Sequence, residues 1–242
     1  MEKNKILQIL FIILACIPFL SIILLGLAIH FYPGGHLLDN FNEGFSFLYN
    51  TISDLGQLIA YNDIPNTISR ILYRIILISL AFTGLTYNSI IWKFFQDRKA
   101  TKWLSRIGSF FGITLAGLYV GLAFITDDTH PYAHLKMIYL AESVLFTTIL
   151  IYDIVYFLKK DFSKLNTYSY LAIIIVSVLL MLTIAIAPRF GDELFHASRR
   201  GGHVIFTFIV TFVYGLQGIG AYLYVRKQTI DNLKTNIPIE QK

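Results

Sequence analysis

The sequence predicts an all-α polytopic membrane protein, a bundle of six transmembrane helices with an amphipathic helix in its first outer loop. Composition is the first indication, because 55% of the 242 residues are hydrophobic and 14% are charged, whereas soluble domains carry about 25% charged residues. The mean hydropathy is +0.62. These values make a soluble enzyme, a nucleic-acid-binding protein and a disordered chain poor interpretations. The expected partners are membrane lipids, with no nucleic acid.

Long apolar runs are the second indication. A helix needs roughly 20 residues to cross the hydrocarbon core of a bilayer. Five uncharged runs reach about this length, and a sixth is apolar apart from Glu142 and Asp153. We expect one domain, 1–242, with spans at about 6–31, 71–92, 105–126, 132–157, 168–188 and 203–225 and a tail at 226–242. The first run has no small-residue cleavage site after it, so we expect it to be retained.

The distribution of lysine and arginine predicts the orientation. Fourteen of the 20 basic residues fall in the amino terminus, the second and fourth loops and the tail. Because cytoplasmic loops carry the excess of basic residues, both termini are predicted to be cytoplasmic. The protein is then integral to a membrane, which is the cell membrane if the source is prokaryotic. The single cysteine, Cys16, excludes an intramolecular disulfide and a cysteine metal cluster.

The first outer loop contains an apolar stretch from Phe45 to Tyr61. Four polar residues recur within it at helical spacing, namely Asn50, Ser53, Asp54 and Gln57. A polar stripe of this kind is costly in lipid. We therefore expect an amphipathic helix that lies at the outer face or is tucked into the mouth of the bundle, rather than a seventh span.

All six histidines fall on the predicted outer side. Before the fourth span, Thr129 or His130 is expected to cap the helix, with Pro131 at its first position. The carboxylates and imidazoles there are suited to a divalent metal or to proton transfer, although an ordinary helix cap explains them equally simply. Zinc is the cofactor considered, and its candidate ligands are His130, His134, His203 and Asp127. A straight sixth helix would keep His196 and His203 too far apart for one ion, unless Gly201 and Gly202 break that helix.

Two further features point to a polar cavity. Arg199 and Arg200, followed by two glycines and the sixth span, favour an anion such as a lipid phosphate, or else simply anchor the membrane interface. Glu142 is expected roughly 16 Å into the bundle at 1.5 Å per residue. An acid at that depth costs about 2.5–3.5 kcal/mol, so it needs a partner, for which Arg74 and Asn88 are candidates.

Short motifs carry a resemblance to known families. The segment Asn50-Thr51-Ile52-Ser53-Asp54-Leu55-Gly56, then Asn66, then Ile125-Thr126-Asp127 through His130 and His134, resembles a family of six-helix bacterial and archaeal membrane proteins known as domain of unknown function nine-nine-eight. The resemblance covers roughly residues 10–225. The Ser-Asp-x-Gly element is similar to one in the Frag/DRAM/Sfk proteins, which implies a lipid-linked role for Ser53 and Asp54. The ceramidase and progestin-receptor-like hydrolases use the same residue types, but their seven helices and closely spaced histidine pair are not found here.

Together these features predict a protein that binds or acts on a lipid or other amphipathic ligand in an outward-facing polar cavity. Asn50, Gln57, Arg199 and Arg200 are the candidate ligand-binding residues, and Ser53, Asp54 and Glu142 are the candidate catalytic residues. The alternatives are a zinc-dependent intramembrane lipid hydrolase, a proton-coupled transporter that uses Glu142, and a haem held by His134 and His203. Whether the protein is an enzyme stays open on sequence alone.

Overall fold

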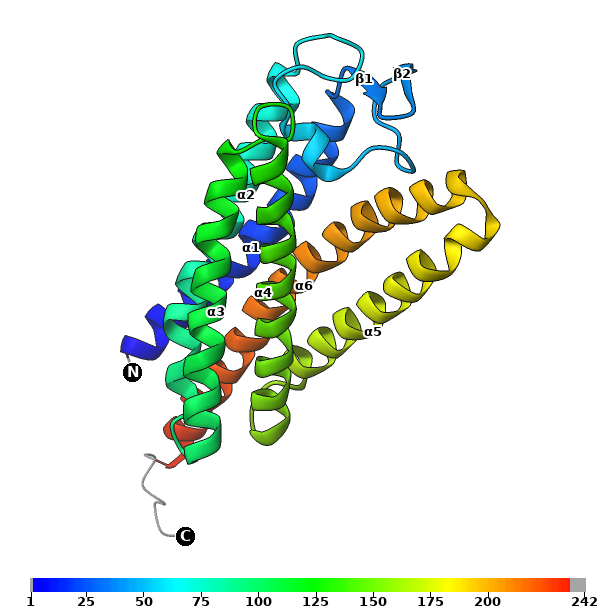
Figure 1. Cartoon of the computed structure of the whole chain (residues 1–242). Helices are drawn as coiled ribbons and strands as arrows, with labels where there is room; N and C mark the ends of the chain where they lie inside the picture. The colour runs from blue at the N-terminus through cyan, green and yellow to red at the C-terminus, as the bar shows by residue number, and fades with distance from the viewer. Residues whose placement is uncertain (1, 236–242) are drawn as a thin grey trace, which may run out of the picture.

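The computed structural model of the chain describes residues 2–235 and is predominantly helical (Figure 1). Its long helices are α1 (Glu2–His30), α2 (Thr67–Ile91), α3 (Lys99–Phe124), α4 (Pro131–Leu158), α5 (Lys164–Ile186) and α6 (Asp192–Thr235). The short elements are β1 (Gly34–His36), β2 (Asp39–Glu43) and the 3-10 helices η1 (Ile52–Gly56), η2 (Trp92–Phe94) and η3 (Ala187–Phe190). Each long helix is apolar and long enough to cross a membrane. The predicted six-span, all-α membrane protein is confirmed.

The boundaries of the helices follow local signals in the sequence. His130 is the N-cap residue of α4 and Pro131 occupies its first turn, as predicted. Proline is favoured there because the first N–H groups of a helix have no partner within the helix. The sixth helix begins earlier than expected, at Asp192, and it continues through the predicted tail as far as Thr235. The remainder of that tail, 236–242, lies outside the described residues.

The helices form an antiparallel bundle with two distinct ends. We call the end where α1 begins and α6 finishes the terminal end, and the opposite end, which carries residues 31–66, the loop end (Figure 1). Helix α1 packs extensively along α6, and α3 packs between α2 and α4. Helices α5 and α6 pack on each other, but toward the loop end they lean away from α4 (Figure 1). The bundle is therefore tight at the terminal end and open on one side near the loop end.

A group of buried amides and hydroxyls joins α2, α5 and α6 near the terminal end; we call Tyr87, Asn166, Ser169 and Gln217 the terminal polar cluster. The Asn166 Nδ2 donates to Gln217 Oε1 at 2.7 Å, and Gln217 Nε2 donates to the Ser169 hydroxyl at 2.8 Å. Asn166 Nδ2 also reaches the Tyr87 hydroxyl at 3.4 Å. Because buried polar groups are costly unless they are paired, this cluster fixes α5 against α6 in one arrangement.

The contact between α1 and α6 depends on Gly218. A Cβ atom built on Gly218 would lie 2.8 Å from the backbone nitrogen of Ala15 and 2.9 Å from its Cα. Small residues allow helix backbones to approach this closely, which is the usual means of helix association in membranes. The α1–α6 contact therefore has no room for a side chain at this position.

We expect Gly218→Ala to lower the free energy of unfolding by about 1–3 kcal/mol, because one of the two backbones must shift. The matched control is Gly117→Ala in α3, where a Cβ would meet nothing within 4 Å. Thermal unfolding of both variants in detergent measures the difference. Equal stability of the two variants would contradict this account of the contact.

The connection between α1 and α2, residues 31–66, differs from the prediction. In place of an amphipathic helix over Phe45–Tyr61, the structure has the β1–β2 hairpin followed by irregular chain and the short helix η1. Asn50 explains the difference, since its Oδ1 accepts from the Ser46 N–H at 2.9 Å and its Nδ2 donates to the Gly35 carbonyl at 3.0 Å. Side chains that satisfy backbone groups in this way compete with a regular helix. The polar stripe is nevertheless tucked into the bundle mouth, because Asn50, Asp54 and Gln57 are buried.

Candidate functional site

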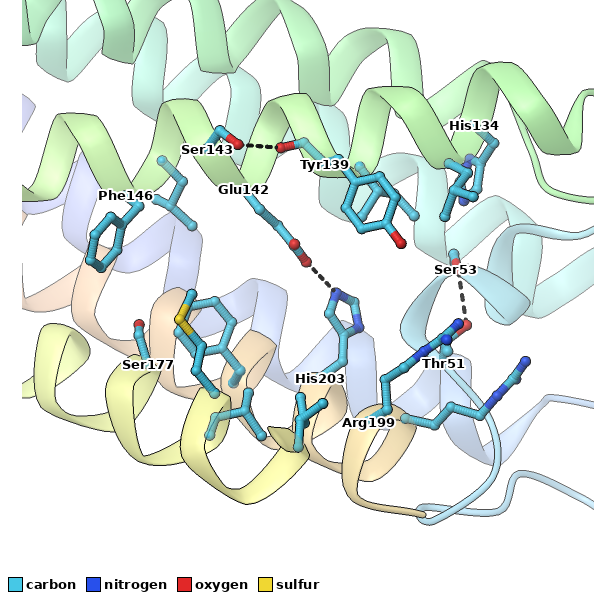
Figure 2. Close-up of a pocket in the computed structure, with 18 of the residues that line it drawn as sticks. Thr51, Ser53, His134, Tyr139, Glu142, Ser143, Phe146, Ser177, Arg199 and His203 are labelled. Carbon is cyan, nitrogen blue, oxygen red and sulfur yellow. Dashed lines mark hydrogen bonds and ion pairs between the residues drawn. The ribbon is translucent and has the colours of Figure 1, made fainter. Parts of the chain in front are cut away.

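A cavity of about 610 Å³ lies where α5 and α6 lean away from α4. Helix α4 forms one wall, α5 and α6 form the other, and η1 lies at one end (Figure 2). Polar side chains gather at the end near η1, where Thr51, Ser53, His134 and Arg199 lie, whereas Phe146 and Ser177 lie toward the other end (Figure 2). The volume falls in the range of about 300–1,000 Å³ that is typical of ligand sites.

Asp54 organises the polar end of the cavity from η1. Its Oδ2 accepts hydrogen bonds from the Thr51 N–H and from Asn50 Nδ2, both at 2.9 Å, and its Oδ1 accepts one from the Thr51 hydroxyl at 2.6 Å. The Ser53 hydroxyl lies 2.9 Å from Thr51 Oγ1. Asn66 holds the whole turn by donating to the carbonyls of Asp54, Leu55 and Gln57. The turn around η1 thus contributes a rigid group of polar side chains to this end of the cavity.

Arg200 connects this loop to α6. Its Nη1 lies 3.7 Å from Asp54 Oδ2 and donates to the Tyr49 carbonyl at 3.1 Å. Burial raises the pKa of the Asp54 carboxyl, while the hydrogen bonds from Thr51 and Asn50 and the charge of Arg200 act in the opposite direction. The Tyr49 hydroxyl donates to Glu193 at 2.8 Å, and this bond raises the pKa of Tyr49. The charge of Arg200 is therefore used within the protein to hold the loop against α6.

The two glycines after Arg200 were expected either to approach a ligand or to break the sixth helix. Helix α6 passes through both without a break. A Cβ at Gly201 would lie 2.9 Å from the Phe47 carbonyl, and one at Gly202 would overlap the Leu180 side chain. The glycines therefore make room for the loop and for α5, and the structure assigns them no ligand.

His134 is held in one orientation beside the cavity. Its side chain is 2% exposed, and its Nδ1 lies 2.6 Å from the Ile125 carbonyl oxygen. A carbonyl only accepts hydrogen bonds, so Nδ1 carries a proton and Nε2 is the nitrogen left to bind another group. Among residues 2–235, the buried Nε2 has no hydrogen-bond partner. The imidazole lines the polar end of the cavity, and its Nε2 is buried there without a partner among the described residues.

Glu142 pairs with His203 across the cavity. The carboxylate reaches from α4 toward the imidazole on α6, with 3.5 Å between Oε1 and Nε2 (Figure 2). The two partners predicted for Glu142 are engaged elsewhere, since Arg74 donates to the Ala123 carbonyl and Asn88 to the Gly84 carbonyl. The expectation that an acid inside a span needs a polar partner is thus met, but by a histidine of a distant helix.

A second cavity, of about 110 Å³, continues from the first into the core of the bundle. Glu142, His203 and Ser53 line both spaces, so the carboxylate–imidazole pair lies where they meet. The smaller space extends to the hydroxyl-bearing residues Tyr119 and Tyr214.

The candidate zinc ligands do not gather into a metal site. Asp127, His134 and His203 line the larger cavity, but His130 is exposed at the start of α4 and does not. Within residues 2–235, no three histidine, cysteine or acidic side chains form a group that could hold a metal ion. The residues considered for zinc therefore do not fit the ion in this arrangement, because its sites use three or four protein ligands. His134 and His203 instead each engage one oxygen of the protein itself.

The other candidate residues either line the cavity or stabilise the loop beside it. Ser53, Asp54, Glu142, Arg199 and Arg200 all line the cavity. Asn50 and Gln57, predicted to bind ligand, are buried in the loop and support it without forming part of the wall.

Two residues that line the cavity, Thr51 and Ser177, were not predicted from the sequence as site residues. Thr51 and Asp54 make a capping box in η1, and the Thr-x-x-Asp spacing signals it directly. Ser177 gives no comparable signal, because a hydroxyl in an apolar span equally often bonds to its own helix, as this one does at the Ile173 carbonyl.

Comparison with known proteins does not identify a function for this cavity. No family model, no curated protein and no solved structure matches the chain.

Proposed function

We propose that the protein binds a membrane lipid, which enters sideways between α4 and the α5–α6 pair and places its anionic headgroup at the polar end of the cavity. The single observation that carries this proposal is the contrast between two adjacent arginines. Arg200 is buried and paired with Asp54. Arg199 lines the same cavity, is exposed, and has no hydrogen bond or ion pair within residues 2–235. A cation free to bind beside a fixed polar end suits a phosphate.

The apolar part of the cavity supports a lipid rather than a free anion. Beyond Glu142 the walls are mostly aliphatic and aromatic, with Phe146 and Ile149 on α4 and Ile173 and Met181 on α5, and Ser177 is a polar exception. Such walls favour a hydrocarbon chain because burying apolar surface is worth about 25 cal/mol per Å². A chain that leaves between α4 and α5 remains in hydrocarbon throughout.

The orientation of the protein is part of the proposal. Basic residues of the short connections, including Lys93, Lys99, Lys102 and Lys160, belong to the terminal end. Because such residues concentrate on the cytoplasmic side, the terminal end faces the cytoplasm and the cavity opens on the other side.

The two alternative functions, a zinc-dependent hydrolase and a proton-coupled transporter, are supported by fewer features of the structure. A zinc-dependent hydrolase needs a group of metal ligands that residues 2–235 do not provide. A proton-coupled transporter is favoured by the position of Glu142 and His203 between two cavities. Transport also requires a path through the terminal end, where Tyr156 packs against Phe162 and Phe162 against Tyr224. Lipid binding needs no such rearrangement, and it is therefore the function that the geometry supports best.

Replacing Arg199 with alanine is expected to reduce the phospholipid that co-purifies with the protein by about tenfold, since a charge-assisted hydrogen bond is worth about 1.5–3 kcal/mol. Mass spectrometry of the lipid extracted per mole of purified protein measures this. The matched control is Arg189→Ala, which removes an exposed arginine of η3 that does not line the cavity. Equal lipid content in the two variants would contradict the proposed headgroup site.

A further inference from the structure

The polar end of the cavity contains two opposite charges that make no hydrogen bond or ion pair with any group in residues 2–235. Arg199 is one, and Asp127, from the connection between α3 and α4, is the other. Neither residue has a hydrogen bond or an ion pair in the part of the chain that the structure describes. The other charged side chains that line the cavity have contacts within the protein: Arg200 lies 3.7 Å from Asp54, and Glu142 lies 3.5 Å from the His203 imidazole. A ligand that carries one negative and one positive group would compensate both free charges.

His134 supplies an independent indication. Its Nε2 is buried, has no partner within residues 2–235, and belongs to a side chain that lines the same cavity. With Nδ1 fixed on the Ile125 carbonyl, Nε2 is available only as an acceptor while the ring is neutral. A buried acceptor without a partner costs free energy, so the site is completed by a group that donates a hydrogen bond. Asp127 is also an acceptor, and the ligand must therefore bring donors to this side of the cavity.

We infer that the cavity selects a lipid whose headgroup carries both a phosphate and a primary amine, as in a phosphoethanolamine lipid. The phosphate binds Arg199, while the ammonium donates to Asp127 and His134. This inference rests on the proposed lipid-binding function and specifies its ligand class.

Two common headgroups satisfy the site less well. A phosphocholine group carries a positive charge but no N–H donor, so it leaves the His134 Nε2 unpaired. A phosphoglycerol group has hydroxyl donors but no positive charge, so it leaves the Asp127 carboxylate uncompensated beside an anion. Only the primary amine provides the charge and the donors together.

The test is competition among lipids with identical acyl chains. Purified, delipidated protein is incubated with mixed vesicles that contain equal amounts of phosphatidylethanolamine, phosphatidylcholine and phosphatidylglycerol, and the retained lipids are quantified by mass spectrometry. We expect phosphatidylethanolamine to be retained about tenfold over each of the other two, as one charge-assisted contact implies. An excess of water-soluble glycerophosphoethanolamine should leave this lipid in place, and displacement by it would overturn binding of a membrane-resident ligand.

The matched variants are Asp127→Asn and Asp128→Asn. Both remove one carboxylate from the same connection, but Asp128 does not line the cavity and instead accepts from the backbone N–H of Leu58. Asp127→Asn should abolish the preference for phosphatidylethanolamine over phosphatidylglycerol, and Asp128→Asn should retain it. Lipid retained without a headgroup preference, but lost in Arg199→Ala, would overturn the amine inference and leave the proposed function standing. If none of these experiments detected retained lipid, both the amine inference and the proposed lipid-binding function would be overturned.

Discussion

Asp54→Leu is expected to lower the free energy of unfolding by about 3–5 kcal/mol, the range found when one partner of a buried ion pair is removed. Asp54 is 2% exposed and accepts from the Thr51 N–H, the Thr51 hydroxyl and Asn50 while facing Arg200. Leucine leaves the Thr51 N–H without its acceptor, leaves Asn50 with only the Gly35 carbonyl to accept from it, and leaves the Arg200 guanidinium buried beside an apolar side chain. The loop that forms the polar end of the cavity should then separate from α6.

A second substitution, added to Asp54→Leu, tests whether the unpaired charge of Arg200 causes the loss of stability. Adding Arg200→Met to Asp54→Leu removes the unpaired charge, and replacement of a buried ion pair by apolar side chains is often neutral. The double variant should therefore be more stable than Asp54→Leu alone, which a double-mutant cycle of thermal unfolding in detergent detects. Additive losses from the two substitutions would show that the ion pair at 3.7 Å contributes no coupling.

Asn166→Ala is expected to cost about 2–4 kcal/mol, combining an unsatisfied buried acceptor with the space that the missing amide leaves. Asn166 is fully buried and donates to both the side chain and the backbone carbonyl of Gln217. Its loss leaves Gln217 Oε1 unpaired and weakens the join between α5 and α6. Hydrogen exchange of the first turns of α5 should accelerate with the loss of stability.

The control for Asn166→Ala is Asn40→Ala, an asparagine exposed at the β1–β2 hairpin. That variant should unfold at the same temperature as the unmodified protein, because an exposed side chain away from special features changes stability little. If Asn166→Ala behaved in the same way, the terminal polar cluster would not be what holds α5 in place.

The helices were predictable because of the solvent in which they fold. In lipid every backbone N–H and carbonyl must be satisfied within the chain, so a long apolar run has almost no alternative to a helix. The start of α4 at His130 and Pro131 was also predictable, because it is marked by residues that are adjacent in the sequence. The loop was not predictable, because Asn50 and Asn66 bond to backbone groups that the turn itself must first bring near.

The candidate site was only partly predictable for a related reason. Burial cost alone singled out Glu142, and residue type singled out Arg199 and the histidines. The partner of Glu142 proved to be His203, far away in the sequence, and no periodicity within α4 could indicate it. Hydropathy could not indicate that α5 leans away from α4. A helix face that lines an apolar cavity and a helix face that contacts lipid are equally apolar.

The convergence of α4 and α5 at the terminal end limits which molecules reach the cavity. A wedge closed at one end of the bundle communicates with only one leaflet of the bilayer. Lipids of that monolayer reach it by lateral diffusion, whereas those of the opposite monolayer must first flip across. Under the proposed lipid-binding function, the occupancy of the cavity would therefore follow the composition of a single leaflet and not the total lipid content of the membrane.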